Sequence, residues 1–349
     1  LLLLLYSIMN IYQTFLKLLL TLEWNINRDS DMKPLVVNTW NFEKAARAAY
    51  NTVTKGESAV LSVVKGCTVC EELQCDGTVG FGGSPDEKGE TTLDALLIDG
   101  ETHNMGAVGC LRNIKNAIGV AQKVLENTEH TILVGEKATQ FAISMGFNEE
   151  SLSTPHSINL WETWKNNSCQ PNFWADVTPD PRSNCGPYSP ELSNEIDMGR
   201  DPQKFNNGNH DTIGMIVIDN DGKIAAGTSS NGANHKIPGR VGDAAIPGAG
   251  AYALKSVGAA VATGDGDVMM RFSPSYRVVD EMRRGTPSSK AAQLVISEIA
   301  ALYPKFFGAV IGVSATGEIG AACHGMESFP YCVGVGGKVE EKSVKCINI

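Results

Sequence analysis

Residues 212–228 read Thr-Ile-Gly-Met-Ile-Val-Ile-Asp-Asn-Asp-Gly-Lys-Ile-Ala-Ala-Gly-Thr, and this stretch decides the fold. An apolar run from Thr212 to Ile218 meets the turn residues 219–222, and a second apolar run returns to Thr228. Two β-prone runs joined by a short Asp/Asn/Gly turn are typical of a hairpin. The first strand of this hairpin therefore begins at a threonine.

The loop that precedes Thr212 suggests a catalytic role for this residue. A polar, Gly- and Asn-rich loop, 206–209, leads to Asp211, so the peptide bond before Thr212 is open to cleavage. A freed α-amine has an ordinary pKa of about 7.7–8.0 and would lie beside the Thr212 hydroxyl, whose proton it could take. One residue would then supply both base and nucleophile. The alternative is purely structural, because β-branched residues are common in strands.

Four sequence blocks after the threonine favour the chemical interpretation. They are Gly-Thr-Ser-Ser-Asn-Gly (227–232), Gly-Arg-Val-Gly-Asp (239–243), Ile-Pro-Gly-Ala-Gly-Ala-Tyr (246–252) and Ala-Thr-Gly-Asp-Gly-Asp (262–267). With them the chain resembles the glycosylasparaginases (aspartylglucosaminidases), which are N-terminal-nucleophile amidohydrolases. The similarity runs from about residue 34 to the end, and it includes segments 34–42, 75–94, 105–135 and 169–188.

Apolar patterning predicts strands and helices in both halves of the chain. The expected strands are 35–39, 93–98, 307–313 and 319–323, and the expected helices are 42–53, 108–125, 138–145, 249–263 and 288–302, the last with Thr286 as N-cap. This mixture favours a layered α/β fold over a doubly wound nucleotide fold. The resemblance implies a four-layer αββα sandwich with two facing antiparallel sheets. The polar segment 155–209 is predicted to be a linker that ends at the cleavage point.

Composition narrows the classes of partner. The 349 residues include 36 Gly, and the net charge is −10. Because no basic run is present, we expect no nucleic-acid partner. The apolar first 22 residues are interrupted by Asn10, Gln13 and Lys17, which favours a signal-peptide-like lead (1–31) over a membrane anchor or a misassigned gene start.

The expected organisation is therefore one hydrolase domain in two pieces. Residues 32–211 would form its α chain and residues 212–349 its β chain after self-cleavage, with the two chains remaining associated. The resemblance implies a dimer of this two-chain unit, with no membrane segment in the mature form. It also implies delivery to the lysosome through the secretory pathway.

Nine cysteines fit more than one interpretation. The spacing Cys67-x-x-Cys70 suggests a redox or metal pair, but no second pair with zinc spacing follows. The resemblance instead implies the disulfides Cys70–Cys75, Cys169–Cys185 and Cys323–Cys346. It leaves Cys67, Cys110 and Cys332 as buried free thiols.

The resemblance also implies the reaction and its residues. Thr212 would attack the amide that joins N-acetylglucosamine to asparagine, and the Thr263 hydroxyl and Gly264 amide would stabilise the oxyanion. The alternative for Thr263 is a helix C-terminus next to a glycine cap.

Substrate binding is expected in the loop that carries Arg240 and Asp243. A bidentate Arg suits an α-carboxylate and an Asp suits an α-ammonium; a solvated loop ion pair is the alternative. The resemblance adds Gly266 and the pocket aromatic Trp40, for which a core position is the alternative.

Self-cleavage would begin with attack of the Thr212 hydroxyl on the Asp211 carbonyl, and three further residues are implied in it. Asp211 is a candidate base or source of strain, or else only a turn residue. Thr78 stands where the family has a serine, and Ser230 stands where it usually has a threonine; both keep a hydroxyl.

No cofactor or metal is expected. The segment Asp219-x-Asp221-Gly222 lacks the glutamate of a calcium loop. Residues 264–267, Gly-Asp-Gly-Asp, lack the Lys and Ser/Thr of a phosphate loop. Two other functions stay open, namely an isoaspartyl peptidase or asparaginase on the same fold, and an inactive, uncut secreted binding protein.

Overall fold

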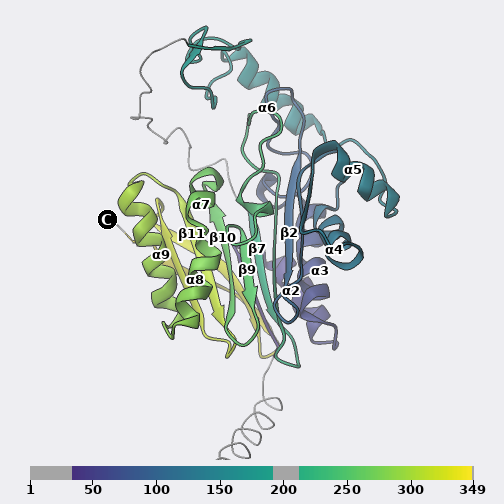
Figure 1. The fold of residues 1–349 in the computed structure, drawn as a ribbon, viewed down its shortest axis with the longest axis vertical. Coiled ribbons are helices and arrows are strands. Elements are labelled where there is room, and N and C mark those ends of the chain that lie inside the picture. The colour runs from purple at the N-terminus through teal and green to yellow at the C-terminus, as the bar shows by residue number, and fades with distance from the viewer. Residues whose placement is uncertain (1–33, 192–211, 348–349) are drawn as a thin grey trace, which may run out of the picture.

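Two facing β-sheets form the centre of the molecule (Figure 1). The structure is a computed structural model that describes residues 34–191 and 212–347. The larger sheet contains, in spatial order, β14 (Lys338–Lys345), β13 (Ser328–Val335), β1 (Leu35–Thr39), β7 (Ile213–Ile218), β8 (Ile224–Ser230), β2 (Leu93–Asp99), β3 (Met105–Leu111) and β4 (Ile132–Val134). The smaller sheet contains β12 (Ile319–His324), β11 (Gly308–Ser314), β10 (Gly258–Gly264) and β9 (Ala251–Leu254).

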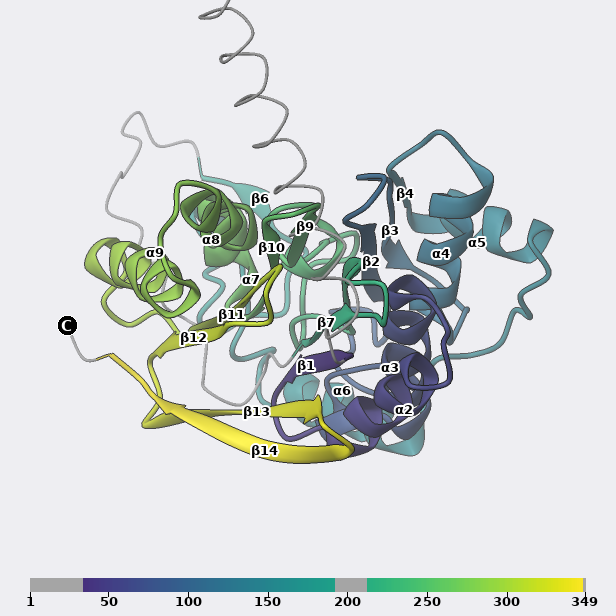
Figure 2. The same cartoon turned by 90° about the horizontal axis from the view of Figure 1, so that it is seen from below.

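Helices cover the outer face of each sheet, which gives four layers (Figures 1 and 2). The larger sheet is covered by α2 (Glu43–Val53), α3 (Ala59–Leu73), α4 (Ala117–Asn127) and α5 (Gly135–Ser144). The smaller sheet is covered by α8 (Pro274–Arg283) and α9 (Ser288–Leu302), and the short α7 (Gly266–Phe272) follows β10. The αββα prediction is therefore confirmed, although the edge pair β3–β4 is parallel.

Three apolar clusters hold the layers together. One joins α2, α3 and α4 to the larger sheet, a second lies between the sheets, and a third joins the smaller sheet to α8 and α9. Strand β7 is buried at every position because both of its faces are covered. An uninterrupted apolar run is what such a strand requires.

The predicted hairpin is confirmed as β7 and β8, but two predicted helices are wrong. Residues 249–263 form β9 and β10, and the first part of 108–125 is strand β3, with α4 starting only at Ala117. Strands buried on both faces, built from Ala, Gly and Val, carry no alternating pattern that separates them from a buried helix. The Thr286 cap is also wrong, because α9 is preceded by Pro287 and the Thr286 hydroxyl donates to Glu281.

The predicted linker contains a helix and a two-stranded ribbon, which its polar composition did not indicate. Helix α6 (Pro155–Asn166) starts with a capping box in which Thr154 and Ser157 exchange hydrogen bonds. A two-stranded ribbon, β5 (Val177–Thr178) with β6 (Ser189–Pro190), follows. The lead peptide and residues 192–211 lie outside the described residues.

The covalent links match the pairs named above. Disulfides join Cys70 to Cys75, Cys169 to Cys185 and Cys323 to Cys346. The remaining thiols, Cys67, Cys110 and Cys332, are free and buried.

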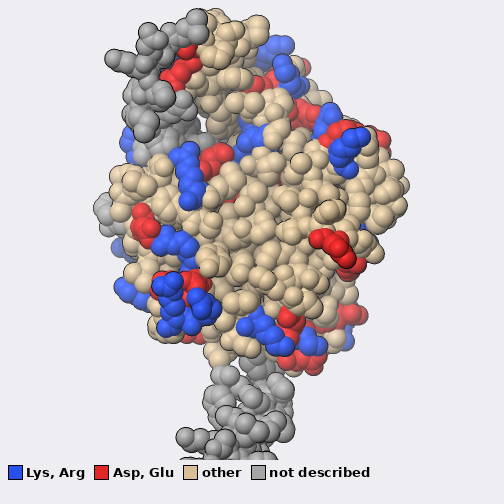
Figure 3. Space-filling model, in the orientation of Figure 1, with Lys and Arg blue, Asp and Glu red and all other residues tan. Residues whose placement is uncertain are grey.

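The surface in Figure 3 mixes both charge signs, with no continuous basic area on the face shown. Within 34–191 and 212–347, no helix combines the length and the hydropathy needed to cross a membrane. No group of three or more His, Cys, Asp or Glu suited to a metal ion occurs in that part of the chain.

Candidate active site

Thr212 lies directly before β7 and is almost fully buried. The Thr39 hydroxyl on β1 donates to its carbonyl at 2.7 Å and accepts the Gly214 N–H at 2.8 Å. Thr39 is itself completely buried, so these bonds are shielded from water. The start of β7 is therefore fixed by the neighbouring strand, a role for Thr39 that the sequence pattern did not indicate.

Thr263, on strand β10 of the smaller sheet, contacts Thr212. The Thr212 N–H donates to the Thr263 hydroxyl oxygen at 3.0 Å, and the Trp40 indole N–H donates to the same oxygen at 2.9 Å. Thr263 is on strand β10, so its alternative role at a helix C-terminus is wrong. The candidate nucleophile and the candidate oxyanion residue thus lie in contact across the two sheets.

Trp40 adopts a conformation that its residue type rarely takes. Its φ is 61°, and positive φ is uncommon for a bulky residue outside special positions. The indole packs edge-on against Phe329 at 5.0 Å and stacks with Phe307 at 6.2 Å between ring centroids. These rings hold the indole N–H against Thr263. Trp40 packs against two of the apolar clusters and is not among the residues that line the pocket beside Thr212, so its predicted role as a pocket aromatic stays a prediction.

A small pocket opens beside Thr212. Six of the predicted residues line it, and they are Thr212, Ser230, Arg240, Asp243, Gly264 and Gly266. The remaining lining residues are Asp94, Gly232, Gly242 and Ala244. Chain segments on both sides of residue 211 therefore build one pocket.

Glycine is required at Gly264. Its φ is +127°, and a Cβ there would lie 2.4 Å from the Gly308 Cα and 2.5 Å from the Phe307 carbonyl oxygen. Any side chain would separate β10 from β11 at the pocket, so this backbone can approach a ligand only as glycine.

Arg240 is buried beside the pocket. Its side chain is 14% exposed, and Nη2 and Nε lie 2.9 and 3.3 Å from the Asp267 Oδ2. A solvated loop ion pair is therefore ruled out. Its Nη1 approaches Gly242 and Gly232, two residues of the pocket lining, where a Cβ would lie 2.7 and 3.0 Å away. Asp267 thus occupies one edge of the guanidinium, and Nη1 lies against the pocket lining.

Asp243 supplies the opposite charge. It is 4% exposed, and its Oδ2 is buried with no hydrogen-bond partner among the described residues. Burial raises the pKa of Asp243 to about 7, with Arg240 lowering it and Asp267 and Asp94 raising it further. This carboxylate oxygen lies at the pocket and can accept a hydrogen bond from a donor or cation that enters it.

Asp94 completes the site and was missed in the sequence. It is buried on β2, where Oδ1 accepts the Cys110 N–H and Oδ2 accepts the Gly242 N–H, both at 2.8 Å. It thereby pins the loop between Arg240 and Asp243. The sequence signal that could have indicated Asp94 was the presence of a carboxylate inside the apolar run 93–98.

The residues predicted for self-cleavage are only partly brought together. The Ser230 hydroxyl oxygen accepts the Gly232 N–H at 3.0 Å and faces the pocket. Thr78 lies behind it, where its carbonyl accepts the Asn231 N–H at 2.8 Å and its hydroxyl lies 3.4 Å from the Cys75 carbonyl. Asp211 lies outside the described residues.

A second cavity is larger but chemically different. It has a volume of about 330 Å³ and lies between α3, α4 and the segment after α5, with Glu71, Phe81 and Lys115 in its wall. None of the predicted site residues lines it. Chemistry rather than size therefore identifies the candidate active site.

Two facing sheets between helical layers, with a buried threonine at the start of a central strand, define the layered fold of the N-terminal-nucleophile hydrolases. A family model described as "Asparaginase" matches residues 15–340, and the chain belongs to this family.

Relatives in animals are similar over nearly the whole chain. A rat N(4)-(beta-N-acetylglucosaminyl)-L-asparaginase is 56% identical over 90% of this chain and 91% of its own length. The mouse protein of the same name is 53% identical over 96% and 98%, respectively. A putative enzyme of this name from Drosophila melanogaster is 52% identical over 91% and 84%.

Proposed function

We propose that this chain is a self-cleaving amidohydrolase that splits the bond between N-acetylglucosamine and the side-chain nitrogen of asparagine, with Thr212 as its nucleophile. The observation that carries the proposal is the 3.0 Å contact between the Thr212 nitrogen and the Thr263 hydroxyl, beside a pocket that holds Arg240 and Asp243. The names of the rat and mouse relatives support this substrate.

In the first stage the Thr212 hydroxyl attacks the carbonyl carbon of Asp211. The peptide C–N bond breaks as an ester forms, and the nitrogen of Thr212 takes a proton to become an amine. Water then hydrolyses the ester, which leaves an α chain ending at Asp211 and a β chain of residues 212–349. Thr39 supports this step because it holds the Thr212 carbonyl and restrains the nucleophile.

In the second stage the new amine takes the proton of its own hydroxyl. The Thr212 oxygen attacks the side-chain amide carbon of the substrate, and the Thr263 hydroxyl and Gly264 amide stabilise the oxyanion. The amine passes its proton to the leaving nitrogen, which departs as the glycosylamine. Water hydrolyses the resulting ester, which releases aspartate and frees Thr212. A second water then hydrolyses the glycosylamine to the free aminosugar and ammonia.

The deciding experiment combines chain analysis with a substrate comparison. Mass spectrometry and terminal sequencing of the purified native protein should find a chain that begins at Thr212. The same preparation should hydrolyse N4-(β-N-acetylglucosaminyl)-L-asparagine much faster than a β-aspartyl dipeptide. The reverse preference would identify an isoaspartyl peptidase, and one uncut, inactive chain would identify a binding protein.

We also propose the assembly and destination that this function implies. The two chains remain associated as one domain, and two such units form a dimer. Residues 1–31 act as the lead peptide for the secretory pathway, and the mature enzyme acts in the lysosome without a membrane segment and without a cofactor. The three disulfides support an oxidising route.

Gly266→Ala should weaken substrate binding. A Cβ at this position would lie 2.6 Å from the Asp243 Oδ1 and 3.0 Å from the Arg240 Nη2, so both groups must shift. Overpacking of this kind costs about 1–3 kcal/mol, which corresponds to a rise in KM of roughly 5- to 150-fold. Steady-state kinetics should show this rise in a variant that is still cleaved before Thr212; an unchanged KM would contradict the role of Gly266.

Binding of L-aspartate, the product, should release a proton at pH 6. The pKa of Asp243 is raised to about 7, so the free enzyme holds this carboxyl mostly protonated at pH 6. The α-ammonium of the ligand favours the ionised form and expels the proton. Titration calorimetry in buffers of different ionisation enthalpy should measure close to one proton released per ligand.

Because binding of aspartate is coupled to ionisation of Asp243, the affinity for aspartate depends on pH. Affinity for aspartate should fall up to about tenfold per unit as pH drops below 7. The raised pKa also means that the contribution of Asp243 to folding stability declines as pH rises from 3.8 towards 7. Asp243→Asn should bind weakly with no proton release; release that persists in this variant would assign the proton to another group.

A further inference from the structure

Lys236 is a buried cation beside the pocket with no role in the scheme above. It is 2% exposed, and its Nζ donates to the Asn231 carbonyl at 2.7 Å and the Ser84 carbonyl at 3.1 Å. Both acceptors are neutral, and no carboxylate among the described residues forms a direct ion pair with the ammonium. A buried charge held in this way is costly and indicates a use for the charge itself.

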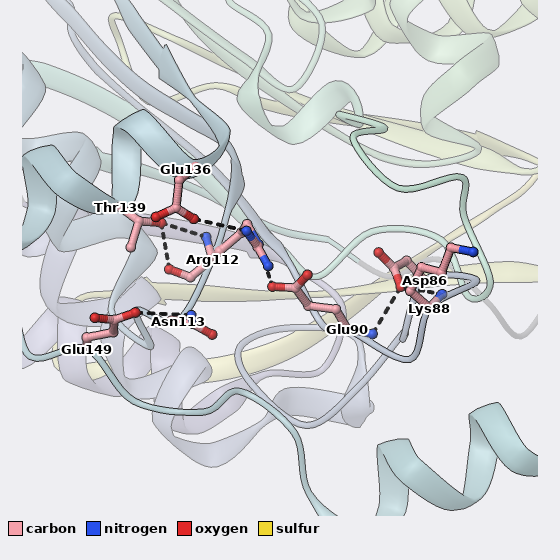
Figure 4. A network of polar contacts seen from close by, with 8 residues as sticks. All are labelled: Asp86, Lys88, Glu90, Arg112, Asn113, Glu136, Thr139 and Glu149. Atoms are coloured by element: carbon pink, nitrogen blue, oxygen red, sulfur yellow. Dashed lines mark hydrogen bonds and ion pairs between the residues drawn. The ribbon is translucent and has the colours of Figure 1, made fainter.

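The surroundings of Lys236 are rigid. Its backbone carbonyl accepts the Glu87 N–H at 3.1 Å, and the Asp86 carboxylate holds the turn by accepting the N–H groups of Lys88 and Glu90 at 2.7 and 3.0 Å. Arg112 then links Glu90 to α5 through its contacts with Glu136, as Figure 4 shows. These contacts hold the loop that presents the Ser84 carbonyl to the ammonium.

That position is next to Arg240. A Cβ on Gly232, which lines the pocket, would lie 3.0 Å from the Arg240 Nη1 and 3.6 Å from the Lys236 Nζ. Two positive groups thus lie against the same glycine. The charged and titratable groups that act on Lys236 are Asp94 on β2, Arg240 on its own loop, Asp86 on the facing loop and Cys110 on β3.

We propose that Lys236 is a specificity-determining residue whose buried ammonium adds a second positive charge to the subsite that Arg240 provides, and so selects substrates with a free α-carboxylate. This inference rests on the proposed function, because it deepens the assignment of Arg240. Lys236 does not touch the reacting atoms; it acts through the field at the subsite.

Two substrates and three variants test this role. The substrates are glycosyl-asparagine and its α-carboxamide, and the measured quantity is the ratio of their kcat/KM values at pH 6.5. Lys236→Gln removes the charge and keeps hydrogen-bond donors for the two carbonyls, whereas Lys236→Met removes both. Lys88→Met is the matched control, because Lys88 is an exposed lysine on the facing loop.

The wild type and Lys88→Met should prefer the free acid strongly and equally. Both Lys236 variants should lose about tenfold of this preference, the size expected for one charge acting across several ångström of protein. If Lys236→Gln keeps the wild-type preference for the free acid, the inference is wrong. Lys236 would then serve only to hold the two loops together through its hydrogen bonds. A wild type that does not distinguish the two substrates would overturn the Arg240 subsite and this inference with it.

The pH dependence separates the effect of charge from the effect of packing. Burial lowers the pKa of Lys236 to about 8. The kcat/KM ratio of wild type to Lys236→Gln with the free-acid substrate should therefore be about tenfold below pH 7 and approach one above pH 9. Titration of the substrate and of the Thr212 amine cancels in this ratio, so a deficit that is the same at every pH would contradict the proposal.

Discussion

Thr212→Ala should leave the chain uncut and turnover at least about 10⁴-fold below wild type. Removal of a catalytic nucleophile in other hydrolases costs as much or more. In the proposed mechanism the same hydroxyl also carries out the backbone cleavage that exposes the amine. Intact-mass analysis should find no chain beginning at residue 212, and product release from glycosyl-asparagine should stay near background.

Thr212→Ser is the matched control, because it keeps the hydroxyl and loses only a methyl group. It should cut itself and hydrolyse substrate, both more slowly than the wild type. A Thr212→Ala preparation that is cut at the same bond and turns over normally would refute the mechanism at its first step.

Arg240→Ala should raise KM for glycosyl-asparagine far more than it lowers the rate of self-cleavage. Loss of one member of a buried charge pair costs about 2–5 kcal/mol, which corresponds to roughly 30- to 5000-fold in affinity. The loss is large because Asp243 would remain buried, and the partly exposed Asp267 would lose its ion pair, without the guanidinium. Product inhibition by aspartate should weaken in parallel with KM.

Two further substitutions sharpen this result. Arg240→Lys keeps the charge but not the planar fork, so it should fall between wild type and Arg240→Ala. Arg271→Ala, at an exposed position on the same helix as Asp267, should behave like wild type. Equal KM values for all of these proteins would show that Arg240 does not bind the substrate.

Sequence patterns predicted the helices and strands correctly where the local signals agree with the tertiary structure. The hairpin around residues 219–222 combines a turn motif with apolar runs on each side, and α9 has a clear helical period. The patterns failed where a strand is covered on both faces. Residues 249–263 are rich in Ala and Gly. Strand β10 is buried at every position, so its sequence shows no alternation of polar and apolar residues.

The site was predictable to the extent that its residues lie in short sequence blocks that resemble those of the glycosylasparaginases. Arg240, Asp243, Gly264 and Gly266 come from such blocks and line one pocket. Thr39 and Asp94 were missed because their partners are distant in sequence; the Thr39 hydroxyl bonds to a residue 173 positions away. Contacts of this kind depend on sheet order, which local patterns do not contain.

The order of strands in the larger sheet has a consequence for how the cut enzyme would denature. Strand β1 lies between β13 and β7, and β8 pairs with β2, so ladders cross three times between residues before 211 and residues after it. None of the three disulfides ties one side to the other. Once the backbone is severed, melting separates two molecules, and renaturation becomes a second-order encounter between them. The proposed cut would therefore turn a reversible folding reaction into an assembly reaction, and heat inactivation of the cut enzyme would be governed by its rate of unfolding.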